Sequence, residues 1–115
     1  MRKVVSSTTF TKMALSFPES EKAPHFEKNS FRVRKKIFAT LNEAENRATV
    51  KLSEIDQSVF CCNEALMFPV PNKWGKQGWT HINLNTIPEA MCLDALTKSF
   101  GEVAPKKLLL TIKSK

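Results

Sequence analysis

The chain has 115 residues, a length that suits one domain around one hydrophobic core and leaves no room for a second. Its apolar fraction of 42% and charged fraction of 25% are typical of soluble globular proteins and argue against a disordered chain. Eighteen Lys and Arg residues against eleven Asp and Glu give a net charge of +7. No apolar run approaches the ~20 residues of a bilayer-spanning helix, so we expect no membrane partner.

The first residues and the cysteines bear on the cellular compartment. Thr8, Thr9 and Lys12 interrupt any apolar core of a secretory signal. The cysteine count is odd, and Cys61 and Cys62 are adjacent, which suits neither a disulfide framework nor the C-x-x-C spacing of zinc and redox sites. We therefore expect a cytoplasmic protein whose cysteines are small buried side chains, with no bound metal and no cofactor.

Positive charge is unevenly distributed along the chain. Residues 1–36 carry +6, residues 37–72 carry −3 and residues 73–115 carry +4. Two basic stretches of this kind favour a polyanionic partner, because cations that neutralise phosphates release condensed counterions. Solubility alone is the alternative explanation of the charge.

The first predicted element is an amphipathic helix. Its apolar residues recur at helical spacing and are Phe10, Met13, Ala14 and Phe17. A hydroxyl among residues 7–9 caps its start, and Pro18 ends it. The following residues 19–25 are mostly polar and include Pro24, which predicts a loop.

Residues 30–41 predict a β-hairpin whose turn contains Arg34, Lys35 and Lys36. A two-residue turn brings Phe38 to the face that carries Phe31 and Val33. The turn contains neither Gly nor Asn, so its type and register stay open. A three-residue turn instead puts a different set of apolar side chains on one face, namely Phe31, Val33, Ile37, Ala39 and Leu41.

Residues 48–52 alternate apolar and polar side chains, which predicts a half-buried strand. Ser53 can then cap a helix with Glu54 and Asp56 in its first turn, where negative charge is favourable. Residues 68–71 contain two prolines and predict a short edge strand. The apolar stripe of the intervening helix consists of Ile55, Val59 and Cys62.

Residues 72–78 form a predicted loop with two glycines, which we expect to serve tight turns. Trp79 and His81 share one face of a strand over residues 79–84, and its other face is apolar. A final helix begins at Pro88. Residues 106–115 are expected to extend as a strand or to cover a sheet edge. The inward stripe of the final helix is predicted to be Leu93, Leu96, Phe100 and Val103.

The element order α-β-β-β-α-β-β-α predicts an α+β fold with a single antiparallel sheet and helices packed on one face. We assign residues 1–115 to one domain. The first and last segments, residues 1–7 and 109–115, are expected to be flexible.

Six segments stand out by their order and spacing: Pro24-His-Phe, residues 30–41, Val50-Lys-Leu-Ser, Phe68-Pro-Val-Pro, Trp74-Gly-Lys-Gln-Gly-Trp-Thr and Ala104-Pro-Lys-Lys-Leu. Through them the sequence resembles the MmcQ/YjbR family across most of residues 24–108. This resemblance implies a frataxin-like (CyaY-like) fold and the role of a double-wing DNA-binding protein, with β-hairpins as the wings. Relatives commonly have glycine near Arg34 and Lys35, whereas the turn here is basic throughout, which changes the expected shape of the wing and strengthens its charge.

Charge and resemblance together predict a non-enzymatic protein with DNA as its partner. Arginine presents a planar fork and lysine a point charge to phosphates, and Trp74 can stack on a base. The alternative interpretation is an ordinary solvated hairpin, with Trp74 pinning its own loop. The candidate contacts are Arg32, Arg34, Lys35, Lys36, Lys73, Trp74, Lys76, Lys106 and Lys107.

Other functions find less support in the sequence. His25 and His81 lack the clustered ligands of a metal site, and we expect a satisfied, half-buried imidazole at His81 and a packing role for Trp79. The resemblance in fold also implies an iron chaperone, since frataxin-like proteins bind iron through an acidic first helix, but here that helix carries Lys12 and no acid. A protein-interaction adaptor is the alternative function, and it predicts a contiguous exposed apolar patch.

Overall fold

A computed structural model describes residues 5–25 and 28–104, and within these ranges the chain forms one antiparallel six-stranded sheet and four helices. The strand order is β1-β2-β3-β4-β6-β5. The predicted α+β class and single antiparallel sheet are therefore confirmed. The elements are α1 (Ser7–Leu15), β1 (Ser20–His25), β2 (Lys28–Val33), β3 (Lys36–Asn42), β4 (Arg47–Lys51), α2 (Glu54–Phe60), β5 (Met67–Pro69), α3 (Lys73–Lys76), β6 (Trp79–Asn83) and α4 (Glu89–Val103).

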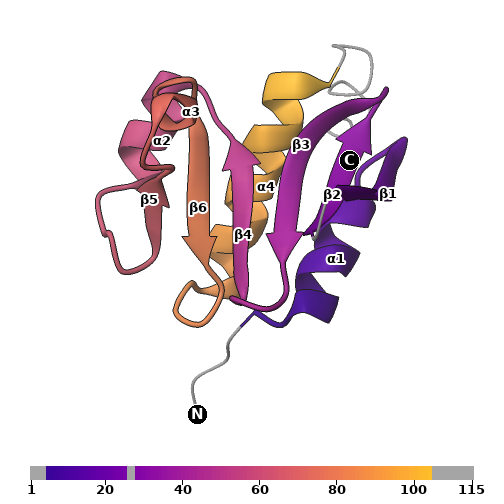
Figure 1. The fold of residues 1–115 in the computed structure, drawn as a ribbon, viewed down its shortest axis with the longest axis horizontal. Coiled ribbons are helices and arrows are strands. Elements are labelled where there is room, and N and C mark those ends of the chain that lie inside the picture. Colours follow the sequence, from indigo (N-terminus) through magenta and orange to yellow (C-terminus); the bar gives the residue numbers. More distant parts are fainter. Residues whose placement is uncertain (1–4, 26–27, 105–115) are drawn as a thin grey trace.

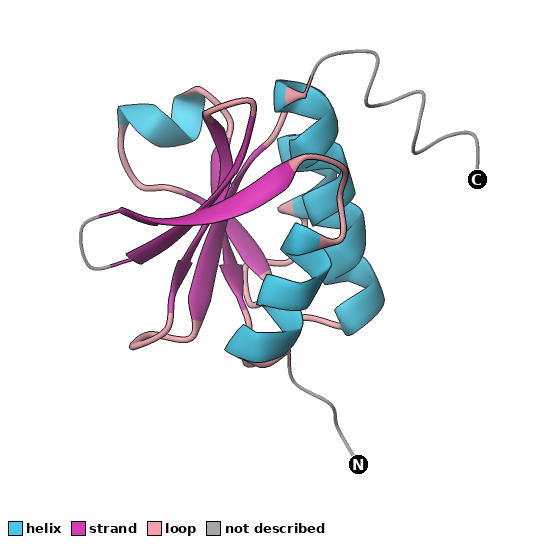
Figure 2. Ribbon diagram, turned by 90° about the vertical axis from the view of Figure 1, so that its right-hand side faces the viewer, coloured by secondary structure: helices cyan, strands magenta, loops and turns pink. Residues whose placement is uncertain are grey.

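Two helices, α1 and α4, cover one face of the sheet, whereas α2 and α3 lie near one end of β5 and β6 (Figure 1). In the view turned by 90°, the two longer helices stand together on one side and a short helical stretch lies on the other (Figure 2). The prediction that the helices pack on one face is thus correct for α1 and α4 only. Much of the opposite face has no helix over it.

Aromatic side chains form the centre of the core between the sheet and its two helices. Phe17 stacks on Phe100 with ring centroids 4.9 Å apart, and Phe38 meets Phe100 edge-on at 5.4 Å. These offset and edge-to-face geometries are the ones that aromatic rings prefer. The predicted stripe of α1 is confirmed, because Phe10, Ala14 and Phe17 are buried.

The cap of α1 lies one residue before the predicted range. Ser6 Oγ accepts a hydrogen bond of 3.1 Å from the amide of Thr9. Val5 is buried, and its amide donates to the carbonyl of Leu84 at 3.2 Å. Residues 5–7 were expected to be flexible, but a cap and a core contact hold them. Residues 1–4 and 106–115 lie outside the described residues.

The basic hairpin has a two-residue turn. Val33 pairs with Lys36, and the residues between them, Arg34 and Lys35, have φ values of 52° and 70°. Two successive left-handed residues are the mark of a type I′ turn, whose twist matches that of the flanking strands. The shorter of the two turns that the sequence left open is therefore the one that forms.

A β-bulge in β3 decides which hairpin side chains enter the core. Phe31 pairs with Ala39 but Arg32 pairs with Ile37, so Phe38 is an extra residue without a partner in β2. As a result Phe38 and Ala39 are both buried, while Ile37 lines a cavity on the other face. Neither sequence register is right alone. The short turn brings Phe38 to the core face, and the bulge keeps Ala39 there as well.

Two elements were not predicted, so the predicted order is wrong. Residues 20–25 form β1 instead of a loop, because they pair with β2 along their whole length. Pro24 is tolerated there since β1 is an edge strand. Residues 73–76 form the short helix α3, whose start is capped by Asn72 Oδ1 accepting a 2.8 Å hydrogen bond from the amide of Trp74. The observed order is α-β-β-β-β-α-β-α-β-α.

Helix α2 starts as predicted but presents its apolar stripe to solvent. Ser53 Oγ accepts a hydrogen bond of 3.1 Å from the amide of Asp56. Ile55 and Val59 are 76% and 63% exposed. Because α2 lies near the edge strand β5, only its Phe60 side reaches the core.

Helix α4 begins one residue later than predicted, since Pro88 is its N-cap residue, and Leu93 is 41% exposed and does not belong to the inward stripe. Ser99, on the buried side of the helix, bridges two strands beyond their last paired residues. Its hydroxyl donates to the carbonyl of Phe38 and accepts from the amide of Lys51 at 3.0 Å. The helix thereby completes the pairing of β3 with β4. The buried positions of α4 are Cys92, Ala95, Leu96, Ser99 and Phe100.

The three cysteines differ in environment. Cys92 is buried, Cys61 is half-buried and Cys62 is exposed. The prediction of buried cysteines is therefore correct for Cys92 and wrong for Cys62. Burial, and to a lesser degree the charge of Glu89, raises the pKa of Cys92 to about 12.

Candidate functional site

The face of the sheet opposite α1 and α4 carries a row of side chains across four strands. Thr40 of β3 pairs with Thr49 of β4, Thr49 with His81 of β6, and His81 with Phe68 of β5. Thr49 Oγ1 and His81 Nδ1 are 2.8 Å apart, and the Phe68 ring meets the imidazole edge-on with centroids 5.2 Å apart. The half-buried, hydrogen-bonded state predicted for His81 is confirmed.

A cavity of about 480 Å³ lies on this face, and we call it the aromatic cleft. Its volume falls within the ~300–1,000 Å³ range of small-ligand sites. No carboxylate is among its described lining residues, so the lining contributes no negative charge. These residues are Ile37, Thr40, Thr49, Val70, Asn72, Trp74, Trp79 and His81.

Two glycines allow the close packing of the wall that carries both indoles. A Cβ on Gly75 would lie 2.0 Å from the carbonyl oxygen of Val70, and one on Gly78 would lie 1.9 Å from that of Leu52. Gly78 also has a φ of 107°, which residues with a side chain rarely adopt. Only glycine can therefore bring α3 this close to β5 and the start of β6 this close to the end of β4.

Gln57 of α2 ties this wall to the rest of the fold. Its Nε2 donates to the carbonyls of Gly75 at 2.9 Å and Trp79 at 3.3 Å, and to Thr80 Oγ1 at 3.0 Å. The two N–H bonds of the amide are shared among three acceptors. No local sequence signal marks Gln57, because its partners lie at least 18 residues further along the chain.

The two indoles differ in exposure but line the same cavity. Trp74 on α3 is 50% exposed, as stacking on a base would require. Trp79, at the start of β6, is half-buried. The prediction that Trp79 only packs within the fold is therefore partly correct, since Trp79 also lines the cleft.

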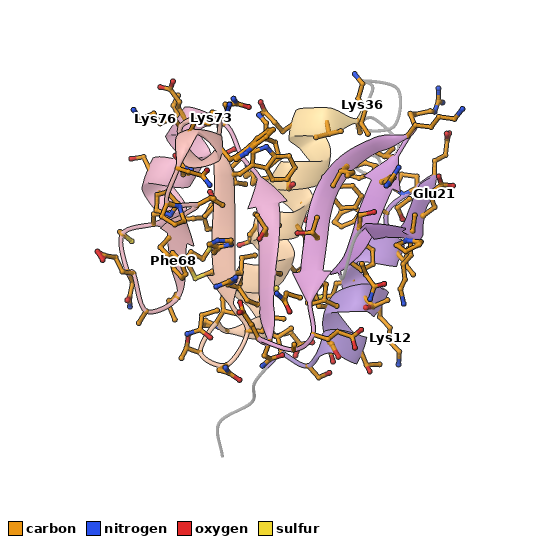
Figure 3. The ribbon with its side chains drawn as sticks, in the orientation of Figure 1. Lys12, Glu21, Lys36, Phe68, Lys73 and Lys76 are labelled. Carbon is orange, nitrogen blue, oxygen red and sulfur yellow. The ribbon has the colours of Figure 1, made fainter. Side chains whose placement is uncertain are left out.

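Four lysines from three separate segments lie around the same end of the sheet. Figure 3 shows Lys36 on one side of the ends of β4 and β6, and Lys73 and Lys76 on the other. Lys51 is the cross-strand partner of Trp79, which places it on the cleft face. Lys36 is instead the partner of the buried Val33, and so it projects at its strand end from the face that α1 and α4 cover. Within the described residues, no carboxylate forms an ion pair with any of these four, which we call the cleft lysines.

Arg34, at the hairpin tip, forms a two-pronged ion pair with Glu19. Its Nε and one terminal nitrogen donate to the two carboxylate oxygens at 2.6 and 3.2 Å. These hydrogen bonds hold the pKa of Glu19 below its ordinary value and the pKa of Arg34 above its own. A phosphate would have to displace this carboxylate to reach Arg34.

The other predicted contacts are distributed over the molecule. Arg32 Nε donates to Ser30 Oγ at 3.1 Å, and Glu21 is the cross-strand partner of Arg32. Lys35 is exposed in the turn. The two predicted contacts after residue 104 are outside the part of the chain that is described. The structure thus places Lys36, Lys73 and Lys76 at one end of the sheet, with Trp74 between the two lysines in α3. Arg34 is paired with Glu19, Arg32 lies opposite Glu21, and neither Lys106 nor Lys107 is described.

Two residues on the cleft face, Thr49 and Lys51, could have been located from the sequence. Thr49 and Lys51 form the polar side of a strand whose apolar side was recognised by alternation. That pattern tells which side faces solvent, but not which strands lie on either side. Ile37 has no such signal, because the bulge at Phe38 changes its face.

In residues 5–25 and 28–104, no three side chains of His, Cys, Asp or Glu gather as a metal ion would require. Over the same ranges, no helix has the length and apolar character needed to cross a membrane.

Fold and site together define a small α+β protein with one antiparallel sheet, two helices on one face and a basic aromatic cleft on the other. The chain belongs to the YjbR family, whose sequence pattern it matches over residues 15–102, as the resemblance to MmcQ/YjbR predicted. The crystal structure of the Deinococcus radiodurans protein DR2400, with a domain of the family DUF419, has a similar fold. The TM-score is 0.76 at 18% identity, over 90% of this chain and 82% of that one. No curated protein matches the sequence.

Proposed function

We propose that this YjbR-family protein binds DNA at the aromatic cleft and the cleft lysines, without catalysing a reaction on it. One observation carries the proposal. Cations from three segments that are distant in sequence lie at the same end of the sheet, and Lys51 among them shares the face of a cleft lined by two indoles and no carboxylate. Lysine ammonium groups suit phosphates as point charges, and indoles suit the flat faces of bases.

In this proposal the basic hairpin forms one flank of the site and α3 the other. The hairpin contributes Lys35 and Lys36, since Arg34 is paired with Glu19 and Arg32 lies opposite Glu21. If the four cleft lysines neutralise four phosphates, log K falls against log salt with a slope of about −3 to −4. The net charge of +7 steers a polyanion to the molecule over longer distances.

A titration of labelled DNA that contains both a duplex and a single-stranded overhang tests this proposal. The site variant is Lys36→Ala with Lys73→Ala, one cation from each flank. The matched control is Lys12→Ala with Lys98→Ala, two exposed lysines on α1 and α4, which removes the same charge elsewhere. We expect the site variant to flatten the salt slope by about 1.5, and the control to keep the wild-type slope.

Two outcomes would count against the proposal. Equal slopes for the two variants would show that the cleft lysines make no phosphate contact. No binding by the wild type at about 100 μM protein and about 50 mM salt would remove DNA binding altogether, because non-specific contacts are detectable under those conditions.

A protein-interaction adaptor is the second candidate function, and exposed apolar side chains on α2 favour it. Ile55 and Val59 are both more than half exposed on one helix side. Under this alternative, Ile55→Ser with Val59→Ser would abolish capture of a partner protein and leave the fold intact. Failure of DNA binding in the titration would favour it.

A further inference from the structure

We infer that the aromatic cleft receives an unpaired base, so that the protein selects single-stranded over duplex DNA. This inference rests on the proposed DNA binding and names the form of DNA that the site takes. The four cleft lysines fit either form, since both carry phosphates. The lining of the cleft distinguishes them.

The two indoles suit a base that has left its stack. Trp74 and Trp79 line one cavity, from α3 and from the start of β6. Base–aromatic stacking requires an exposed π-face, which single strands offer and which a duplex keeps covered by neighbouring base pairs. A cavity of about 480 Å³ has the volume of a small-ligand site, so a base can enter it.

The polar part of the lining suits any base rather than one. Thr40 and Thr49 carry hydroxyl groups, which both donate and accept hydrogen bonds. A hydroxyl can therefore meet either a carbonyl oxygen or an exocyclic amine on a base edge. We expect weak sequence preference, as is usual where stacking dominates.

The positions of the lysines favour a strand over a free mononucleotide. Lys36, at the start of β3, lies on one side of the ends of β4 and β6, and Lys73 and Lys76 lie on the other (Figure 3). A nucleotide within a strand has phosphates on both sides of its base, whereas a nucleoside monophosphate has one. Charge on two flanks therefore complements a strand that passes across the cleft.

The chain has two tryptophans and no tyrosine, so its indole fluorescence reports on the cleft alone. We would titrate the full chain with an oligothymidine of about 12 nucleotides, its duplex, an abasic strand of equal length and thymidine monophosphate. We expect saturable quenching by the oligothymidine. The duplex should bind about 10-fold more weakly and leave the emission unchanged. The abasic strand should bind without quenching, and the monophosphate should not quench at the same concentrations.

Trp74→Ala tests the stacking contact directly. We expect this variant to weaken binding of the single strand by about 10-fold, with unchanged duplex binding and with quenching still reported by Trp79. The matched control is Ile55→Ala, which removes another exposed apolar side chain, on α2, and should change nothing.

The outcomes separate this inference from the proposed function. Equal affinity for single strand and duplex, or single-strand binding without quenching, would overturn the inference and leave DNA binding standing. Quenching by the monophosphate as strong as by the strand would also overturn it. No binding to any of the four probes would remove the proposed function and the inference together.

Discussion

Cys62 and Cys92 carry the same thiol group but differ strongly in burial and therefore in expected reactivity. Cys92 lies on the inner side of α4, and its pKa of about 12 leaves almost no thiolate near neutral pH. Cys62 follows α2 and is exposed. Cys61, between these extremes, is half-buried, and burial followed by the charge of Cys62 raises its pKa.

A thiol-reactive probe at about pH 8 should therefore modify the native protein in order of exposure. We expect Cys62 to react first, Cys61 more slowly, and Cys92 only after unfolding. Mass spectrometry of the digested protein assigns each site. In the control variant Cys62→Ser, the fastest phase should disappear. Rapid modification of Cys92 in the folded protein would contradict its burial.

The left-handed backbone of the hairpin turn between β2 and β3 lowers the stability of the fold, and a substitution in the turn can remove this cost. Lys35 has a φ of 70°, and a left-handed conformation costs a residue with a Cβ about 1–2 kcal/mol. Glycine adopts it without that cost but loses about 0.5–1 kcal/mol through its unfolded-state freedom. The turn therefore tolerates Lys35 at some expense of stability.

We expect Lys35→Gly to raise the free energy of unfolding by about 0.5–1 kcal/mol, measured by urea denaturation. Lys36→Gly serves as the control, because residue 36 lies within β3 and glycine weakens strands. That control should lower stability. An unchanged or lower stability of Lys35→Gly would contradict the turn geometry.

Elements whose apolar residues recur with a helix or strand period could be predicted from the sequence. Elements that form only by pairing or packing with another segment could not. The alternation of residues 48–52 and the apolar stripe of α1 each identify their element and its buried side. In contrast, residues 20–25 have no alternation, and β2 alone makes them a strand. The stripe of α2 was located correctly, but no local pattern tells that Ile55 lacks a partner surface.

The candidate site was only partly predictable for a related reason. The basic turn and the Trp74 segment stand out in composition, and the Trp74 side chain is half exposed. Their shared position depends on β6 inserting beside β4 in the sheet, a long-range pairing. That pairing also brings Lys51 beside Trp79.

The charge that the whole molecule presents at the hairpin tip depends on the ion pair between Glu19 and Arg34. Since the pKa of Glu19 is lowered on folding, its contribution to stability is complete above its ordinary value of 4.5. The contribution is lost as the pH falls below that value and through the lower pKa of the folded state. The hairpin tip is therefore held to the connection between α1 and β1 at neutral pH, and less so in acid.

Glu19→Gln should lower the melting temperature at pH 7 relative to the wild type, and the difference should vanish at low pH, where both side chains are neutral. If the proposed DNA binding holds, the variant also releases Arg34 and steepens the salt slope by about 0.8. Melting curves across pH measure the first effect. A difference that persists unchanged in acid would show that the ion pair is not its cause.

The bridge made by Ser99 has a consequence for how the protein opens. Its hydroxyl links the backbone carbonyl of Phe38 in β3 to the backbone amide of Lys51 in β4. This end of the β3–β4 ladder is therefore hydrogen-bonded through Ser99 only while α4 is docked. Departure of the helix would leave a backbone carbonyl and a backbone amide unsatisfied at once. Helix and central strands should therefore exchange their amide hydrogens as one cooperative unit, with local fraying confined to the outer strands β1 and β5.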